Sequence, residues 1–322
     1  MESSMARHHH NNLLVLPWAE PGKWVYQNAD AHSNIVVCSV PELHVKRSIQ
    51  NVLRSTIRIG RSIKPNDCLI TWEASAAIAT SFAIRLTGAK NPWVALGIIP
   101  KVASPRVNGL LSASLKRASM LTCFSQADIP TLETLTGLRA CDVTPTVWHQ
   151  PVNSVVKKSK SWASVGASNR DDQTLALAAE NCGITVDRFT RSESVFSPSI
   201  AWFVNSPAQA IDAAFHTYHN HLAVLKSTEY ASGLSIAVRA GFARQLLIAT
   251  DTPHMRELII NGENGLLVRC GDSDHLAYVI RSVTQGDVDT DRLSKSLYEV
   301  CREDHTYPVL RRHIDQMVAM CT

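Results

Sequence analysis

The sequence has little of what would mark a membrane-spanning, exported or disordered protein. No apolar run in its 322 residues approaches the roughly 18 that cross a bilayer, and no apolar stretch near the start precedes a small-residue cleavage site. Hydrophobic residues make up 45% and charged residues 19%, which excludes disorder, collagen and coiled coil. We therefore expect a globular, cytoplasmic protein whose length suits two domains.

Cysteine pairs at metal-binding or redox spacing are also missing. The eight cysteines are scattered without a Cys-x-x-Cys pair, and several lie inside apolar runs. This pattern is typical of buried thiols in a reducing compartment. No residues have the paired spacing of metal ligands, so we expect no metal and no cofactor. The short run His8–His10 is interpreted as incidental.

Positive charge is concentrated in the first half of the chain. Lys and Arg outnumber Asp and Glu by 15 to 9 through Asn153, and after it the numbers are 17 and 19. One basic segment with apolar residues between its charges favours an amphipathic helix. This helix either presents a solvated face or attracts an anionic membrane surface or acceptor, and nucleic acid is not expected. Its basic residues are Lys46, Arg47, Arg54, Arg58, Arg61 and Lys64.

Short apolar runs that favour strands alternate with longer stretches of helical spacing, which predicts parallel sheets covered by helices on both faces. A polar, basic stretch from Val152 to Ser164 marks a boundary, so we predict domains 1–153 and 154–322, with the last helix packing back on the first domain. Ligands are expected at the carboxyl ends of strands, between the domains. The predicted strands are Leu13–Leu16, Ile35–Ser39, Cys68–Trp72, Trp93–Leu96, Leu121–Ser125, Asp142–Thr146, Ala163–Gly166, Ser199–Asn205, Leu222–Leu225, Leu246–Thr250 and Gly265–Val268.

One loop of the second half has the composition of a phosphate site. A predicted strand ends at Gly166, and a short polar loop leads into a helix. This order places Arg170 beside backbone N–H groups and a helix N-terminus, which together attract anions. Arg170 therefore either binds a diphosphate or forms a surface ion pair with Asp171 or Asp172.

A second loop repeats the arrangement. Gly233 precedes an apolar helix predicted over 234–242, and it lets the backbone approach a ligand. Ser235 either caps this helix or donates to a phosphate oxygen. Two such helix starts facing one hollow suit a nucleoside diphosphate.

These motifs resemble the donor-binding domain of glycosyltransferase family 4. The likeness covers about residues 160–285 and rests on the Gly166 loop, the segment 232–237 and residues 247–272. It implies the GT-B fold, two Rossmann-like doubly wound domains with a cleft between them. It also implies a nucleotide-sugar donor such as a UDP- or GDP-sugar, bound without a metal. The donor-binding residues that it implies are Gly22, Arg170, Gly233, Leu234, Ser235 and Glu257.

Two further interpretations concern carboxylates. Glu73 directly follows the predicted strand Cys68–Trp72, where it either assists deprotonation of the acceptor or caps the next helix. We take Glu73 and Arg170 as the catalytic candidates. Glu257 matches an acidic position of the family, and its alternative is a helix-start carboxylate that interacts with the helix dipole. Gly22 stands in a Pro-Gly pair that also suits an ordinary turn.

The sequence departs from the family in three motifs. Ala167 occupies the place of an arginine, and Ser232 and Ala240 occupy the two carboxylate places of the Glu-x7-Glu motif. Arg244–Leu246 replaces the usual Gly-x-Pro. Glu229 either substitutes for the first carboxylate or is a surface residue.

The prediction is a hexosyltransferase of the EC 2.4 class that moves a sugar from a nucleotide-sugar donor to a glycan or lipid-linked acceptor. Retention, polysaccharide biosynthesis and a cytoplasmic or peripheral place on the inner membrane face follow from the resemblance. One alternative is a catalytically degenerate GT-B protein that binds a nucleotide or glycan, or supports a partner enzyme. Another is an unrelated sugar-phosphate enzyme with its site away from Arg170 and Ser235.

Overall fold

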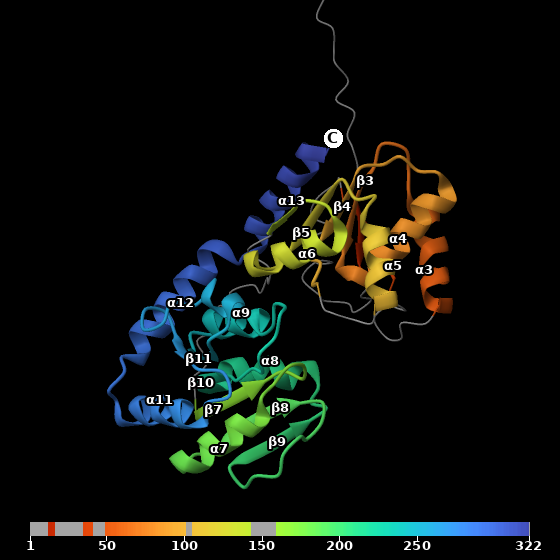
Figure 1. Cartoon of the computed structure of the whole chain (residues 1–322). Coiled ribbons are helices and arrows are strands. Elements are labelled where there is room, and N and C mark those ends of the chain that lie inside the picture. The colour runs from red at the N-terminus through yellow and green to blue at the C-terminus, as the bar shows by residue number, and fades with distance from the viewer. Residues whose placement is uncertain (1–11, 17–34, 41–48, 101–104, 143–158, 322) are drawn as a thin grey trace, which may run out of the picture. The chain divides into compact units, whose positions relative to one another are not determined.

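The chain folds into two compact units, which we describe from a computed structural model (Figure 1). The first unit comprises Met1–Val143 and Arg311–Thr322, and the second comprises Thr144–Leu310. Each unit contains one six-stranded parallel sheet. The predicted domain boundary at 153 lies outside the described residues. The structure describes residues 12–16, 35–40, 49–100, 105–142 and 159–321.

The sheet of the first unit has the order β2-β1-β3-β4-β5-β6, and all its neighbouring strands are parallel. The chain adds β2 on one side of β1 and then returns to add β3 on the other side. The strand order therefore reverses between β1 and β3, which is where open α/β sheets bind ligands. The strands are β1 (Asn12–Leu16), β2 (Ile35–Ser39), β3 (Cys68–Trp72), β4 (Trp93–Leu96), β5 (Met120–Cys123) and β6 (Ala140–Asp142).

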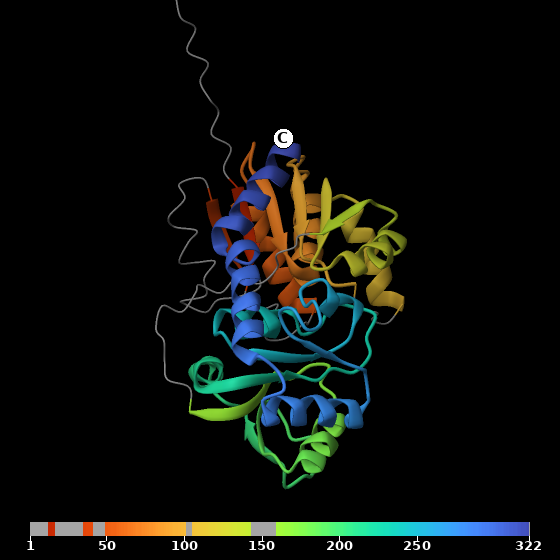
Figure 2. The same cartoon turned by 90° about the vertical axis from the view of Figure 1, so that its left-hand side faces the viewer.

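Helices cover both faces of this sheet. In Figures 1 and 2, α3, α4 and α5 lie on one face, and the C-terminal part of α13 lies on the opposite face. The core between them includes Trp93, which is fully buried and donates from Nε1 to Thr71 Oγ1 at 2.9 Å. The helical elements are α3 (Ile49–Ser62), α4 (Glu73–Thr87), α5 (Pro105–Leu115), η1 (Gln126–Asp128), α6 (Ile129–Thr136) and α13 (Tyr307–Cys321).

The sheet of the second unit has the order β12-β11-β10-β7-β8-β9, again all parallel. Its strand order reverses between β7 and β10. Strand β8 was not predicted, because Asp187 and Arg188 interrupt its apolar pattern. The strands are β7 (Lys160–Val165), β8 (Val186–Thr190), β9 (Ile200–Val204), β10 (Tyr218–Ala223), β11 (Leu246–Thr250) and β12 (Leu266–Val268).

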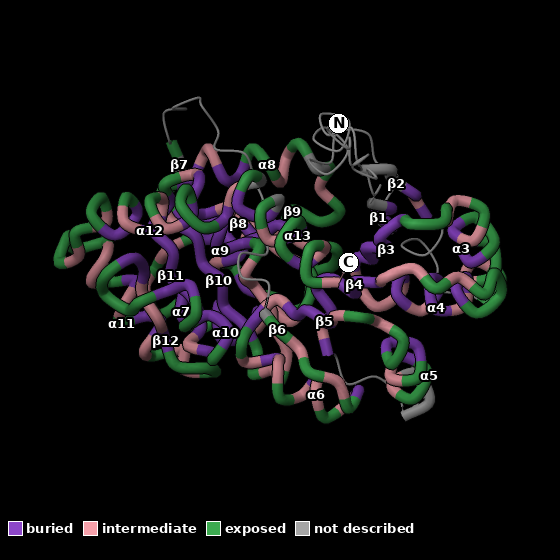
Figure 3. Tube along the Cα trace, turned by 90° about the horizontal axis from the view of Figure 1, so that it is seen from above, coloured by how far each residue is buried: buried purple, intermediate pink, exposed green. Residues whose placement is uncertain are grey.

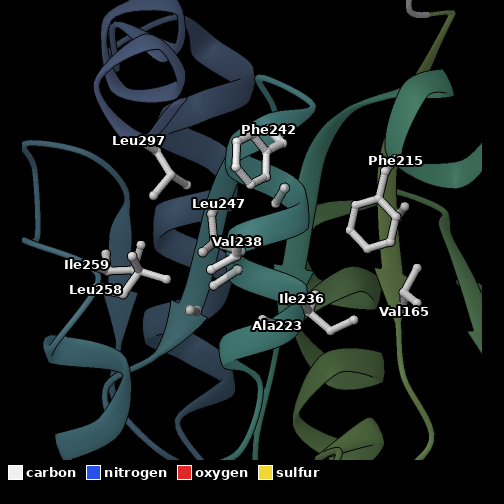
Figure 4. Close-up of a cluster of buried hydrophobic side chains, with 14 of the residues drawn as sticks. Val165, Phe215, Ala223, Ile236, Val238, Phe242, Leu247, Leu258, Ile259 and Leu297 are labelled. Carbon is white, nitrogen blue, oxygen red and sulfur yellow. The ribbon is translucent and has the colours of Figure 1, made fainter. Parts of the chain in front are cut away.

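Two hydrophobic clusters sandwich the second sheet, one on each face. Figure 4 shows the first cluster, in which Ile236, Val238 and Phe242 of α9 lie near Leu247 of β11 and Leu297 of α12. The helices α7 and α11 cover the second cluster. The helices of this unit are α7 (Asp172–Cys182), α8 (Ala208–Thr217), α9 (Leu234–Phe242), α10 (Pro253–Arg256), α11 (Ser273–Gln285) and α12 (Thr290–Asp304).

The predicted α/β architecture of doubly wound parallel sheets is confirmed, with shifts at some element ends. The strand predicted over Asp142–Thr146 begins earlier, at Ala140, and its predicted residues 143–146 lie outside the described part of the chain. None of the eight cysteines forms a disulfide bond, but the prediction of buried thiols is wrong for Cys141 and Cys270, which are exposed. Within the described residues, no helix has the length and apolar character that a membrane span requires.

A buried histidine makes the second unit sensitive to acid. His221 of β10 is fully buried and stacks on Phe215, with ring centroids 5.0 Å apart. Burial first, and then the nearby positive charges of Arg170, Arg239 and Arg188, together lower the pKa of His221 from 6.5 to about 3. The folded state therefore binds fewer protons than the unfolded state between these two pKa values. The unfolding free energy is therefore unaffected by His221 above pH 6.5 and decreases as the pH falls from 6.5 toward 3.

We expect His221→Phe to reduce this loss. Between pH 7.5 and about pH 4.5 the wild type should lose about 2–3 kcal/mol more unfolding free energy than the variant, at 1.36 kcal/mol per unit of pKa shift. Urea unfolding at the two pH values measures the difference. The matched control is His219→Phe on the same strand, where the side chain is exposed. Equal acid losses in wild type and His221→Phe would refute the argument.

Candidate functional site

The topology of the second unit places two loops at one point of its sheet. Strands β7 and β10 are neighbours, and the strand order reverses between them. The loop after β7 contains Gly166 and Arg170, and the loop after β10 runs from Val224 to Gly233. Since the strands are parallel, both loops leave from the same edge, so the two predicted phosphate loops are neighbours.

The first loop holds the Arg170 side chain against its own backbone. Arg170 Nε and Nη2 both donate to Val165 O at 3.1 Å, and Nη1 donates to Ser168 O at 3.1 Å. Gly166 has φ +123°, and a side chain there would overlap the Arg170 guanidinium. The alternative of a surface ion pair with Asp171 or Asp172 is wrong. Asp171 caps α7 by accepting from Thr174 N at 3.1 Å, and Asp172 pairs with Arg188.

The two loops are joined by backbone hydrogen bonds. Arg170 forms an isolated antiparallel bridge with Leu225. Asn169 Nδ2 donates to Lys226 O at 3.2 Å, and Lys226 N donates to Asn169 O at 3.2 Å. The exposed Lys226 therefore lies directly beside Arg170 on the adjoining loop. Lys226 is a second cation beside the predicted phosphate loop, and it was not among the predicted site residues.

The start of α9 lies against the same leucine. Gly233 is the N-cap of α9 with φ 82°, and a Cβ there would stand 3.0 Å from Leu225 Cδ1 and 3.2 Å from Met255 Cε. Leu234 and the exposed Ser235 are the first two residues of the helix, whose N–H groups have no intrahelical partner. The alternative that Ser235 caps α9 is therefore wrong. The Arg170 loop and this helix start both contact Leu225.

Behind the Gly166 loop lies a buried ion pair. Arg188 of β8 is 1% exposed and donates from Nε to Asp172 Oδ1 at 2.7 Å. Arg188 Nη1 also donates to Gly166 O at 2.7 Å and Phe189 O at 2.8 Å, while Ser194 Oγ donates to Asp172 Oδ2 at 2.5 Å. Arg188 thus fixes the carbonyl at which the loop turns.

Burial and neighbouring charges act on the Arg170 guanidinium. Burial first, and then the positive charge of Arg188, lower the pKa of Arg170 from its ordinary value to about 10, while Asp172 opposes the shift. Arg170 remains a cation at neutral pH. Arg170, the exposed Lys226 and the N-terminus of α9 therefore belong to two neighbouring loops that leave one sheet edge, and cations and helix N-termini favour a bound anion.

The acidic positions that the family resemblance predicts lie away from the Arg170 loop in sequence, and only Glu257 carries a carboxylate. Glu257 is exposed and follows α10 at its C-terminal end, so the alternative of a helix-start carboxylate is wrong. Ala240, at the second place of the missing Glu-x7-Glu motif, is fully buried in the core. Its neighbour Arg239 pairs with Asp212 and lies over the Phe215 ring at 4.1 Å.

In the first unit, Glu73 lies at the corresponding point of the sheet. It directly follows β3, whose Thr71 pairs with Val15 of β1, so it stands where the strand order reverses. It is the first residue of α4, and Trp72 is assigned as the N-cap residue without a side-chain cap hydrogen bond. Gly22 lies outside the described residues. No group of three metal-ligating residues occurs in the described part of the chain.

The backbone at Glu73 is strained, and this leads to a prediction. Its φ of 68° is in the left-handed region, which costs a residue with a side chain about 1 kcal/mol relative to glycine. We expect Glu73→Gly to be more stable than Glu73→Ala by about 1 kcal/mol in urea unfolding, although both variants lose the same carboxylate. Equal stabilities would show that the position carries no strain.

The fold defined by these two sheets is the GT-B fold, and comparison with solved structures supports this assignment. The Anabaena protein Alr3699/HepE, solved in complex with UDP-glucose, has a TM-score of 0.73 at 12% identity and covers 97% of this chain and 100% of its own. A glycosyltransferase from Rickettsia africae ESF-5 has a TM-score of 0.68 at 14% identity, covering 95% and 97%. Sucrose-phosphate synthase from Thermosynechococcus elongatus has a TM-score of 0.67 at 13% identity, covering 97% and 98%.

At this level of identity the likeness shows the fold. No protein-family model and no curated protein sequence matches the chain. The predicted GT-B fold is therefore confirmed, and the membership of family 4 stays a prediction.

Proposed function

We propose that this protein is a glycosyltransferase that moves a sugar from a nucleotide-sugar donor to a glycan or lipid-linked acceptor. The observation that carries the proposal is the meeting of the Arg170 loop and the α9 N-terminus at Leu225. Transfer of the sugar leaves a nucleoside diphosphate whose negative charge increases as the bond breaks. Cations and helix dipoles positioned in advance stabilise such charge most effectively.

Each residue of the site has a part in this proposal. Arg170 and the backbone N–H groups of Leu234 and Ser235 bind the diphosphate, and Gly233 lets them approach it. Lys226 supplies a second cation in place of the family's arginine, whose position Ala167 occupies in this chain.

Glu73, Glu257 and Gly22 have the remaining parts in this proposal. Glu73, a residue of the first unit, hydrogen-bonds or deprotonates the acceptor hydroxyl. Glu257 and Gly22 contribute to donor binding. Retention at the anomeric carbon, polysaccharide biosynthesis, and a cytoplasmic or peripheral membrane location belong to the same proposal.

Binding of nucleotides to the full chain tests the first half of the proposal. A ligand that binds only the folded state stabilises it by RT ln(1 + [L]/Kd), about 2.7 kcal/mol at a hundredfold excess over Kd. We expect UDP or GDP to raise the Tm, and inorganic phosphate at equal concentration to have a smaller effect. If neither diphosphate shifts the Tm, the site does not bind a nucleotide.

Turnover separates the enzyme from its degenerate alternative. One observation favours that alternative: the Arg170 guanidinium is already bonded to Val165 O and Ser168 O, in a chain that lacks both Glu-x7-Glu carboxylates. A mass-spectrometric screen of UDP- and GDP-sugars with mixed acceptors should detect transfer or donor hydrolysis. Binding without turnover of any donor would favour the degenerate GT-B protein.

A further inference from the structure

The outer face of α3 presents an apolar stripe to solvent. Figure 3 colours its outer turns as exposed. Three large aliphatic residues follow one another at intervals of four, so they lie on one side of the helix. They are Ile49, Leu53 and Ile57, with exposed fractions of 90%, 55% and 45%. The opposite side of α3 is buried, and Gly60 lies against Thr87 of α4.

A cationic stripe runs beside the apolar one. Arg54, Arg58 and Arg61 are exposed and fall on neighbouring turns, while the sequence of α3 contains no acidic residue. Arg58 donates from Nη1 to Ser39 O at 2.9 Å. Neither Arg54 nor Arg61 forms an ion pair with another residue of the described part of the chain.

We infer that α3 docks on an anionic lipid bilayer, with the aliphatic stripe in the headgroup region and the arginines at lipid phosphates. The two stripes together select this occupant. A nucleic acid or acidic glycan would neutralise the arginines but leave three aliphatic side chains in water. A bilayer surface satisfies both chemistries, since interfacial helices combine apolar insertion with attraction to anionic headgroups. The inference concerns the first unit alone and does not depend on the donor site.

Vesicle flotation of the full chain tests this inference. We expect at least tenfold stronger binding to phosphatidylcholine vesicles containing about 30% phosphatidylglycerol than to phosphatidylcholine alone. Arg54→Gln with Arg61→Gln should weaken binding to anionic vesicles about tenfold or more, since each basic residue near such a surface contributes on the order of 1 kcal/mol. Leu53→Gln with Ile57→Gln should remove the binding that persists at high salt, where charge attraction is screened.

Matched controls come from the second unit. Lys295→Gln with Arg302→Gln removes two exposed charges from α12, and Leu177→Gln removes one exposed leucine from α7; neither should change vesicle binding. Equal binding to neutral and anionic vesicles would overturn the inference. So would a dimer that Leu53→Gln with Ile57→Gln dissociates, because the stripe would then serve a second copy. UDP binding without lipid should be the same in all variants, which separates this result from failure of the proposed function.

Discussion

Arg170→Ala should lower donor turnover by about a hundredfold or more, the effect typical of removing one preorganised group that stabilises charge in a transition state. The guanidinium lies at the reversal point of the second sheet and remains cationic, with its pKa held at about 10 by burial and by Arg188. Arg170→Lys should fall between wild type and Arg170→Ala, because lysine keeps the charge but loses the planar fork. Initial rates of nucleoside diphosphate release measure the loss, and UDP affinity provides a second readout.

The stability of Arg170→Ala must be measured beside its activity. The variant loses three hydrogen bonds to the backbone oxygens of Val165 and Ser168, so a modest destabilisation is expected. Arg281→Ala is the matched control, because the exposed Arg281 also donates to a backbone carbonyl, Asn181 O at 3.4 Å. If Arg170→Ala keeps turnover within threefold of this control, Arg170 does not stabilise the leaving group.

Asp172→Asn should destabilise the second unit by about 3–5 kcal/mol, because it leaves the buried Arg188 guanidinium without its counter-ion. This is a large part of the stability of an ordinary domain. Replacing both partners, Arg188→Met with Asp172→Leu, should recover most of the loss, since an apolar pair of similar volume avoids burying charge. Urea unfolding at pH 7.5 compares the three proteins.

The double variant also separates stability from ligand binding. Arg188 fixes Gly166 O at 2.7 Å, so a stable protein without it should still bind UDP more weakly than wild type. Arg269→Met is the control for stability, because Arg269 pairs with Asp272 at 2.9 Å with 72% of its side chain exposed. Such surface pairs contribute about 1 kcal/mol or less. Asp172→Asn should therefore cost several times more than Arg269→Met, and equal losses would contradict the assignment of a buried pair.

The sequence predicted correctly those helices and strands whose hydrophobic spacing matches the face that is buried in the structure. Helix α9 begins and ends at the predicted residues, because its apolar spacing matches the buried face and Gly233 marks its start. Strand β8 was missed because Arg188 is buried there. In a sequence pattern an arginine predicts a solvent-exposed position, so it interrupts the expected apolar run. Only the packing of Asp172 against it reveals why the charge is tolerated.

The same limit applies to the candidate site. Arg170 and Gly233 were found because each belongs to a loop between a strand and a helix. Lys226 directly follows the predicted strand Leu222–Leu225, so the rule that selected Glu73 was sufficient to find it. The left-handed backbone of Glu73 had no such signal, because it depends on the direction in which the chain leaves the sheet.

The discontinuous make-up of the first unit affects when it can fold. Its sheet is encoded before residue 143, but Arg311–Thr322 belongs to the same unit, and Ile314 and Met317 of this segment are buried. During synthesis, a chain emerging at 5–20 residues per second, a typical rate, delivers these side chains on the order of ten seconds after the last strand of the sheet. Until then one face of the sheet lacks its final helix. The second unit, whose residues are contiguous, has everything it needs to fold first.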